Sequence, residues 1–184
     1  MILLQQVLFR KLGVPVFVAG GIATGRMIAH MLLMGAAGVQ MGTRFVMSEE
    51  CNAHPNLKAR FVKARAREAM STPEYDKRLP IVAVRALKNK STEVFGRLQL
   101  ELLQLMNENK IGHAEAQYKV ESFWMGGLRK AAVDGDVDRG SCMAGQSVGL
   151  VDKVQPMKEI FTELLGGAEA ELEAVKARLG KIGG

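Results

Sequence analysis

Residues 14–43 read VPVFVAGGIATGRMIAHMLLMGAAGVQMGT and contain two short apolar runs separated by a helical pattern. Residues 14–19 are apolar and rich in β-branched side chains, which predicts a strand buried on both faces, as in a parallel sheet. Residues 24–34 have apolar side chains at helical spacing, and Gly35 follows where a glycine ends a helix. Residues 38–41 predict a second strand. The stretch therefore predicts a βαβ unit with short connections.

Glycine-bearing loops follow both predicted strands. Glycines allow a ligand to approach the backbone, and the positive end of a following helix favours an anion. The carboxyl ends of neighbouring parallel strands lie side by side, so the two loops converge. Either loop alone is a weak signal, but together they predict a phosphate site. Its candidate residues are Gly20, Gly21, Gln40, Met41, Gly42 and Thr43.

The rest of the chain is mainly helical by pattern. Helices are expected over residues 3–12, 54–70, 92–107, 113–123, 126–133 and 156–165, with a charged helical tail over 169–179. Residues 71–73, which include Pro73, end the pattern over 54–70. We expect residues 80–87 to be a strand or an extended segment, and residues 134–149, which are rich in glycine, to form a loop.

The positive charge is concentrated in one segment. The chain carries a formal net charge of +6, and residues 58–97 alone carry eleven basic and four acidic residues. A solvated face is the first interpretation of such a segment, an acidic partner the second. Nucleic acid comes last, because stacking aromatics are few there. We therefore predict no nucleic-acid partner.

Composition bounds the class of protein. The chain has 184 residues, 48% of them hydrophobic, which suits one substantial globular domain. No run of apolar residues has the length of a membrane span. The N-terminal apolar run precedes its basic residues, the reverse of an export signal. Two cysteines, Cys51 and Cys142, suit a reducing compartment, so we expect a cytoplasmic protein.

No metal site is expected. The cysteines lack the CxxC spacing of a zinc site. Asp134 opens a segment that resembles a calcium loop, but Arg139 and Gly145 stand where that loop needs glycine and glutamate. His30 is expected to pack or lie on the surface, His54 to cap the helix that follows it, and His113 to start a helix.

Several separated motifs resemble one family of flavoenzymes. They are AGGI at residues 19–22, GVQMGTRF at 38–45, HPN at 54–56 and VRALKN at 84–89, followed by GD at 135–136, GS at 140–141, MAGQS at 143–147 and GL at 149–150. In this order they are similar to the nitronate monooxygenases and type II enoyl-acyl-carrier-protein reductases, over about residues 1–165. The TRF, HPNLK and RALKN segments resemble the enoyl reductase branch more closely, without settling the substrate.

This resemblance implies an α/β fold, the C-terminal portion of a TIM (β/α)8 barrel. Its last two strands would carry the FMN phosphate on Gly20, Gly21 and Gln40 to Thr43, the loops that the barrel rule also selects. A mainly helical insertion and C-terminal helices would complete the chain. The implied parts are the flavin-binding barrel end over 1–50, the insertion over 51–133, a closing motif with a returning helix over 134–165, and a charged tail over 166–184.

The resemblance also implies what this chain lacks. The family's catalytic histidine would lie upstream of Met1, and none of the three histidines matches its position. We therefore expect no catalytic residue here, with Gln146 as a candidate contact of flavin or substrate, or else a residue bonded to backbone in a turn. A complete enzyme would use FMN, and NADH or NADPH as a possible electron donor, on a nitronate or a carrier-protein-bound enoyl substrate.

A second hypothesis is a non-catalytic chain. Two barrel strands leave an unpaired parallel edge, which favours association with another copy or with a segment that completes the barrel. In that interpretation the chain is a fragment or partner module that is inactive alone.

Overall fold

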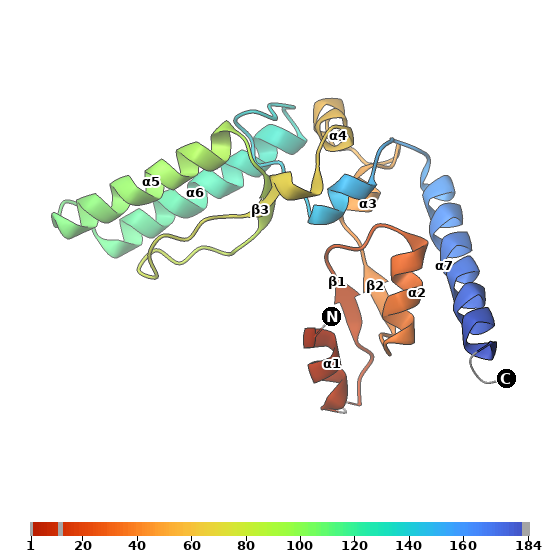
Figure 1. Ribbon diagram of the computed structural model, residues 1–184. Coiled ribbons are helices and arrows are strands. Elements are labelled where there is room, and N and C mark those ends of the chain that lie inside the picture. The colour runs from red at the N-terminus through yellow and green to blue at the C-terminus, as the bar shows by residue number, and fades with distance from the viewer. Residues whose placement is uncertain (1, 11–12, 182–184) are drawn as a thin grey trace. The chain divides into compact units, whose positions relative to one another are not determined.

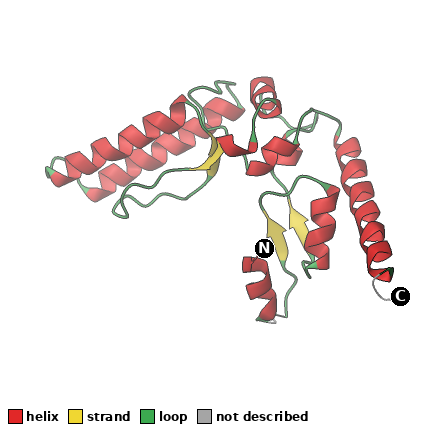
Figure 2. Ribbon diagram, in the orientation of Figure 1, coloured by secondary structure: helices red, strands yellow, loops and turns green. Residues whose placement is uncertain are grey.

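The computed structural model describes residues 2–10 and 13–181, which divide into two compact units. Residues 1–51 and 153–184 form the strand unit, and Asn52–Asp152 forms the helical unit. Both consist of helices with short strands (Figures 1 and 2). Within the described part of the chain, no helix combines the length and the apolar character needed to cross a membrane.

The strand unit contains the βαβ arrangement that the sequence predicts. Strands β1 (Phe17–Ala19) and β2 (Gly38–Gln40) pair in parallel, with Ala19 opposite Gln40. Helix α2 (Gly25–Leu33) connects them and is followed by Gly35 at φ +97°. The α/β prediction and the parallel pairing are confirmed.

The first strand is shorter and more exposed than predicted. It begins at Phe17, after Pro15, which has no N–H to donate to a ladder. The Phe17 side chain is 64% exposed, so the prediction of a strand buried on both faces is wrong. The reason is that the described sheet of this unit has two strands, which leave part of its surface uncovered.

Three further helices belong to the strand unit. They are α1 (Ile2–Phe9), the one-turn α3 (Thr43–Val46) and the long α7 (Met157–Gly180). The predicted end of the first helix, residues 11–12, lies outside the described residues. The sequence predicts two helices here, over 156–165 and 169–179. The structure has one continuous helix, α7, which includes the glycine pair at 166–167.

Helix α7 lies against α2, and the two backbones meet at Gly25 (Figure 1). A Cβ atom added to Gly25 would collide with the Leu164 carbonyl oxygen and lie 2.5 Å from the Ala168 nitrogen. Further along, the Glu171 carboxylate accepts hydrogen bonds from Arg178, 2.9 Å, and interacts with His30, 2.9 Å. Gly167 lies against Gly25, so this glycine of α7 serves close helix packing and does not end the helix.

The helical unit contains seven helices and strands. In chain order these are α4 (Pro55–Val62), η1 (Ala66–Glu68), β3 (Ala69–Ser71), β4 (Arg85–Leu87), α5 (Lys90–Asn107), α6 (His113–Ala132) and η2 (Gln146–Leu150). Strands β3 and β4 are antiparallel, with Ser71 opposite Arg85. Helices α5 and α6 pack on each other through Phe95, whose ring centroid lies 4.9 Å from that of Trp124.

Two helix predictions in this unit are wrong in their bounds. The helix predicted over residues 54–70 ends at Val62. The end of the predicted range belongs to η1 and β3 instead, where the Lys88 amide donates a hydrogen bond to the Glu68 carbonyl at 2.9 Å. The separate helices predicted over 113–123 and 126–133 are one helix, α6. A Cβ at Gly127 would lie 3.4 Å from the Ser141 side chain, so this glycine serves packing within a continuous helix.

Within residues 80–87, where a strand or an extended segment is predicted, the structure contains β4 (Arg85–Leu87), and residues 80–84 before it have no regular secondary structure. The predicted loop over 134–149 includes the start of η2. His54 caps α4, since its Nδ1 accepts a hydrogen bond from the Asn56 amide at 3.1 Å. His113 begins α6. Both of these sequence predictions are confirmed.

We expect the substitution Gly25→Ala to lower the free energy of unfolding by about 1–3 kcal/mol, because backbone atoms of α7 occupy the space of the added methyl group. Urea denaturation measures this change. Gly166→Ala is the control, because its Cβ meets nothing within 4 Å and alanine favours the helix by up to about 1 kcal/mol. Equal stability of the two variants would contradict the α2–α7 packing.

The two thiols are expected to differ in reactivity. Cys142 is 1% exposed, and burial raises the pKa of its thiol to about 11, whereas Cys51 is half-buried. At about pH 8, a disulfide reagent should label Cys51 quickly and Cys142 only upon unfolding. The stability that the neutral Cys142 thiol contributes is lost as the pH rises from 9.0 towards about 11. Rapid labelling of Cys142 in the folded Cys51→Ala variant would contradict the protection of the Cys142 thiol by burial.

Candidate functional site

The two glycine loops emerge from adjacent strand ends. Because Ala19 lies opposite Gln40 in the parallel pair, Gly20 and Met41 continue from neighbouring positions at the same edge. Neighbouring strands of a sheet lie about 4.8 Å apart. The chain turns sharply there, with Gly20 at φ +89° and Gly21 at φ +75°, a region that side chains disfavour.

Open space lies over these glycines. A Cβ added to Gly20, Gly21 or Gly42 would meet no atom within 4 Å. A cavity of about 530 Å³ borders the first loop, with Ala19 to Ile22 in its wall together with side chains of α1 and α2. The backbone of both loops is therefore open to the approach of a polar group.

Helix α2 begins directly after the first loop. Thr24 caps it, and its hydroxyl oxygen accepts a hydrogen bond from the Met27 amide at 3.3 Å. The cap fixes where the loop ends and the helix starts. The positive end of the α2 dipole is thus on the side of the glycine loop.

The other predicted residues frame the second loop. Gln40 is exposed at the end of β2, and Met41 and Thr43 are half-buried. Gly42 is the N-terminal cap of α3, with φ −100°, so its backbone conformation does not require glycine. What sets Gly42 apart is the space beside it.

A buried arginine supports the second loop, and the sequence reasoning missed its role. The Arg44 side chain is 6% exposed, and its Nη2 donates to Gln155 Oε1 at 3.2 Å and to Glu163 Oε2 at 2.5 Å. Gln155 Nε2 donates to the other Glu163 oxygen at 2.8 Å. Hydrogen bonds from Gln155 and Lys153 lower the pKa of the Glu163 carboxyl group. The carboxylate therefore stays charged opposite Arg44.

The backbone reinforces this link between the second loop and the start of α7. The Gln155 amide donates to the Met47 carbonyl at 3.2 Å, and the Glu49 amide donates to the Gln155 carbonyl at 3.0 Å. The rings of Phe45 and Phe161 lie 5.5 Å apart. The signal in the sequence was an arginine next to a phenylalanine in a mostly apolar segment, whose distant acidic partner no local pattern indicates.

Each histidine has a structural role. His30 is exposed on α2 and interacts with Glu171 of α7, while His54 and His113 stand at helix starts. None of them borders the glycine loops in the described cavity wall. Among the described residues, no three His, Cys, Asp or Glu side chains gather as a metal ion requires.

Gln146 belongs to the helical unit, where it is exposed at the start of η2. The glycine loops belong to the strand unit. The contact of Gln146 with flavin or substrate therefore stays a prediction.

The geometry is that of an α/β protein with two glycine-bearing loops at one strand edge, and comparison with known proteins gives the family. The family model described as nitronate monooxygenase matches residues 1–167, so the chain belongs to the nitronate monooxygenase family. It is 27% identical to a probable nitronate monooxygenase of Bacillus subtilis over 153 residues, or 83% of this chain and 40% of the relative. The predicted resemblance is confirmed.

Solved structures agree with this assignment. FabK from Thermotoga maritima is 36% identical, with a TM-score of 0.74, over 96% of this chain and 51% of FabK. A nitroalkane oxidase from Streptomyces ansochromogenes is 26% identical, with a TM-score of 0.68, over 95% of this chain and 44% of the oxidase. The chain thus spans about half the length of these relatives.

We expect Arg44→Met to lower the free energy of unfolding by about 1–3 kcal/mol, because it leaves Gln155 and part of Glu163 without their buried partner. Chemical denaturation monitored by circular dichroism measures it. Arg26→Met is the matched control, since Arg26 also pairs with an acid of α7 but its side chain is 68% exposed. Its cost should be below about 1 kcal/mol. Equal losses in both variants would contradict the role of Arg44.

Proposed function

We propose that this chain supplies the FMN phosphate site of an oxidoreductase of the nitronate monooxygenase and enoyl-acyl-carrier-protein reductase type. The carrying observation is the pair of glycine loops at adjacent ends of β1 and β2, with open space over Gly20, Gly21 and Gly42. These three residues fit a phosphate because nothing on them blocks its approach to the backbone. Gln40, Met41 and Thr43 complete the proposed cradle.

The chain's own residues bind and orient in this proposal. Bound FMN would supply the redox chemistry, which no side chain provides. Gly20 and Gly21 allow the tight turn, the α2 dipole favours the negative charge, and Arg44 keeps the second loop against α7. No acid or base is assigned, because the family's catalytic histidine has no counterpart among the three histidines of this chain.

The strands fit the end of a larger barrel. We propose that β1 and β2 are the last two strands of a TIM barrel, where phosphate sites commonly follow strands seven and eight. The exposed Phe17 on β1 supports this, because a completed barrel would cover it. The helical unit then corresponds to an insertion after the last strand, with α7 returning to the barrel.

The substrate of such a complete enzyme is a nitronate or an enoyl thioester on a carrier protein. Relatives of both names match the chain, so neither is favoured. NADH or NADPH would serve as electron donor in the reductase case. The two unpaired thiols are in keeping with a reducing cytoplasm.

A second candidate function is a non-catalytic module that completes a barrel with another polypeptide or copy. The observation that favours it is the two-stranded parallel sheet of the described strand unit, with Phe17 of β1 64% exposed, because an unpaired strand edge favours association. In this case the phosphate cradle forms fully only in the assembly.

Titration of FMN with the purified chain tests the phosphate site. We expect saturable quenching of flavin fluorescence, and a loss of affinity of at least about tenfold in Gly42→Val, because the side chain would fill the open space over the loop. The backbone at Gly42 tolerates a side chain, so this variant should fold.

Gly112→Val is the matched control, because Gly112 is also a helix cap with open space but lies in the helical unit. It should bind FMN like the unaltered chain. If the unaltered chain does not bind FMN, the isolated chain does not form the phosphate site. That result would favour the module that completes a barrel with another polypeptide or copy. Equal affinities of the two valine variants would reject the second loop as part of the site.

A further inference from the structure

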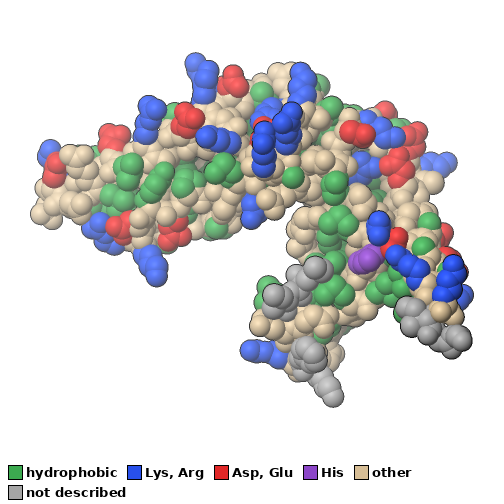
Figure 3. Space-filling model, viewed as in Figure 1, with side chains coloured by type: hydrophobic (Ala, Val, Ile, Leu, Met, Phe, Trp, Pro, Cys, Tyr) green, Lys and Arg blue, Asp and Glu red, His purple; other side chains and the backbone are tan. Residues whose placement is uncertain are grey.

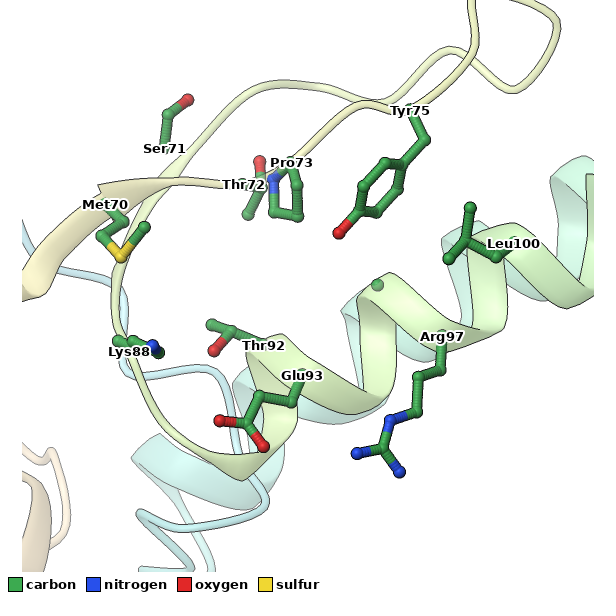
Figure 4. A pocket seen from close by; sticks show the side chains of 11 residues that line it. Met70, Ser71, Thr72, Pro73, Tyr75, Lys88, Thr92, Glu93, Arg97 and Leu100 are labelled. Carbon is green, nitrogen blue, oxygen red and sulfur yellow. The ribbon is translucent and has the colours of Figure 1, made fainter.

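The helical unit contains a cavity of its own, separate from the glycine loops. It has a volume of about 400 Å³ and lies between the segment that follows β3 and one face of α5 (Figure 4). Pro73 and Tyr75 face α5 across the hollow. Its volume is within the range of small-molecule sites.

A buried glutamine holds the cavity in shape. Gln99 of α5 is 1% exposed, its Oε1 accepts a hydrogen bond from the Tyr75 amide at 3.4 Å, and its Nε2 donates to the Pro73 carbonyl at 3.0 Å. A Cβ at Gly96 would lie 3.0 Å from the Tyr75 hydroxyl, so the glycine admits the ring over the helix. The segment is therefore tied to α5 from within, and the cavity is preformed.

The walls of the cavity are largely apolar and accessible. Met70, Tyr75 and Leu100 are 49%, 52% and 54% exposed, and all three line the same hollow. Large apolar side chains gathered around one depression mark a binding site more often than scattered ones do. They favour a ligand with an apolar body.

Two cations stand at the same cavity. Lys88 and Arg97 line it and are exposed, and no ion pair of either is found among the described residues. Glu93, one turn before Arg97, is the acid in the lining, so the balance is positive. Lys and Arg side chains also project elsewhere over this unit (Figure 3). The cavity thus offers an apolar interior and an anion-attracting rim.

We propose that this cavity binds a small amphipathic organic anion, with its apolar body between Tyr75 and Leu100 and its carboxylate or phosphate at the rim, to which Lys88 and Arg97 contribute positive charge. Charge complementarity selects the anion over a neutral or cationic ligand. A cavity of about 400 Å³ suits a small molecule. The inference does not depend on the flavin site.

Amide chemical shifts of the 184-residue chain test the proposal, with octanoate as the probe. Saturable shifts are expected in residues 70–75 and 88–100, with octanol binding several-fold more weakly. Octylammonium, which has the same chain and the opposite charge, should leave these residues unshifted. Octyl phosphate distinguishes the two anion sources, because tighter binding than octanoate would identify a phosphate ligand.

Paired variants separate charge from shape. Lys88→Gln with Arg97→Gln should weaken octanoate binding on the order of tenfold. Lys63→Gln with Lys90→Gln, which removes the same charge at exposed positions outside the lining, should leave it unchanged. Leu100→Trp fills the cavity from an exposed position and should abolish binding in a folded chain.

The proposal is overturned if octanoate shifts no residue of the cavity, or if octylammonium binds equally well. Equal weakening by both double variants would attribute binding to general charge and overturn it too. Shifts caused by an acidic amphipathic peptide but not by octanoate would overturn the small-molecule ligand in favour of a protein partner. Each of these results is read without FMN, so failure of the flavin site leaves the test intact.

Discussion

The close contact between α2 and α7 at Gly25 is the constraint on which the strand unit depends. It joins a helix from the start of the chain to one from its end, and it leaves no room for a side chain. Helix α7 supports both proposed phosphate loops. It packs on α2, which follows the first loop, and through Glu163 it binds Arg44, which follows the second. The two loops therefore keep their positions through one common partner.

The strand unit and the helical unit differ in the surfaces that they present. The strand unit presents backbone at the edge of two parallel strands, and its few buried polar side chains hold loops in place. The helical unit is built on the aromatic contact of Phe95 with Trp124 and on the Gln99 bridge to Pro73 and Tyr75. We infer that the first contributes cofactor binding and the second a separate ligand surface.

Local patterns predicted the elements whose signals are local. The helix over residues 24–34, the parallel strand pair and the cap at His54 follow from spacing and residue type, and the structure contains them. The patterns failed where distant contacts decide. The pairing of β3 with β4 follows the early end of the helix predicted through residue 70. One glycine of each pair packs inside its helix, Gly127 against Ser141 in α6 and Gly167 against Gly25 in α7. Arg44 was missed for the same reason, since Glu163 lies far along the chain.

The central claim is that backbone of the two glycine loops receives the phosphate of FMN. Amide chemical shifts of the isotopically labelled chain, titrated in parallel with FMN and with riboflavin, test it most directly. We expect FMN to shift the amides of Gly20, Gly21 and Gly42, and riboflavin, which lacks the phosphate, to leave them in place. Equal shifts with both flavins, or shifts confined to other residues, would contradict the account.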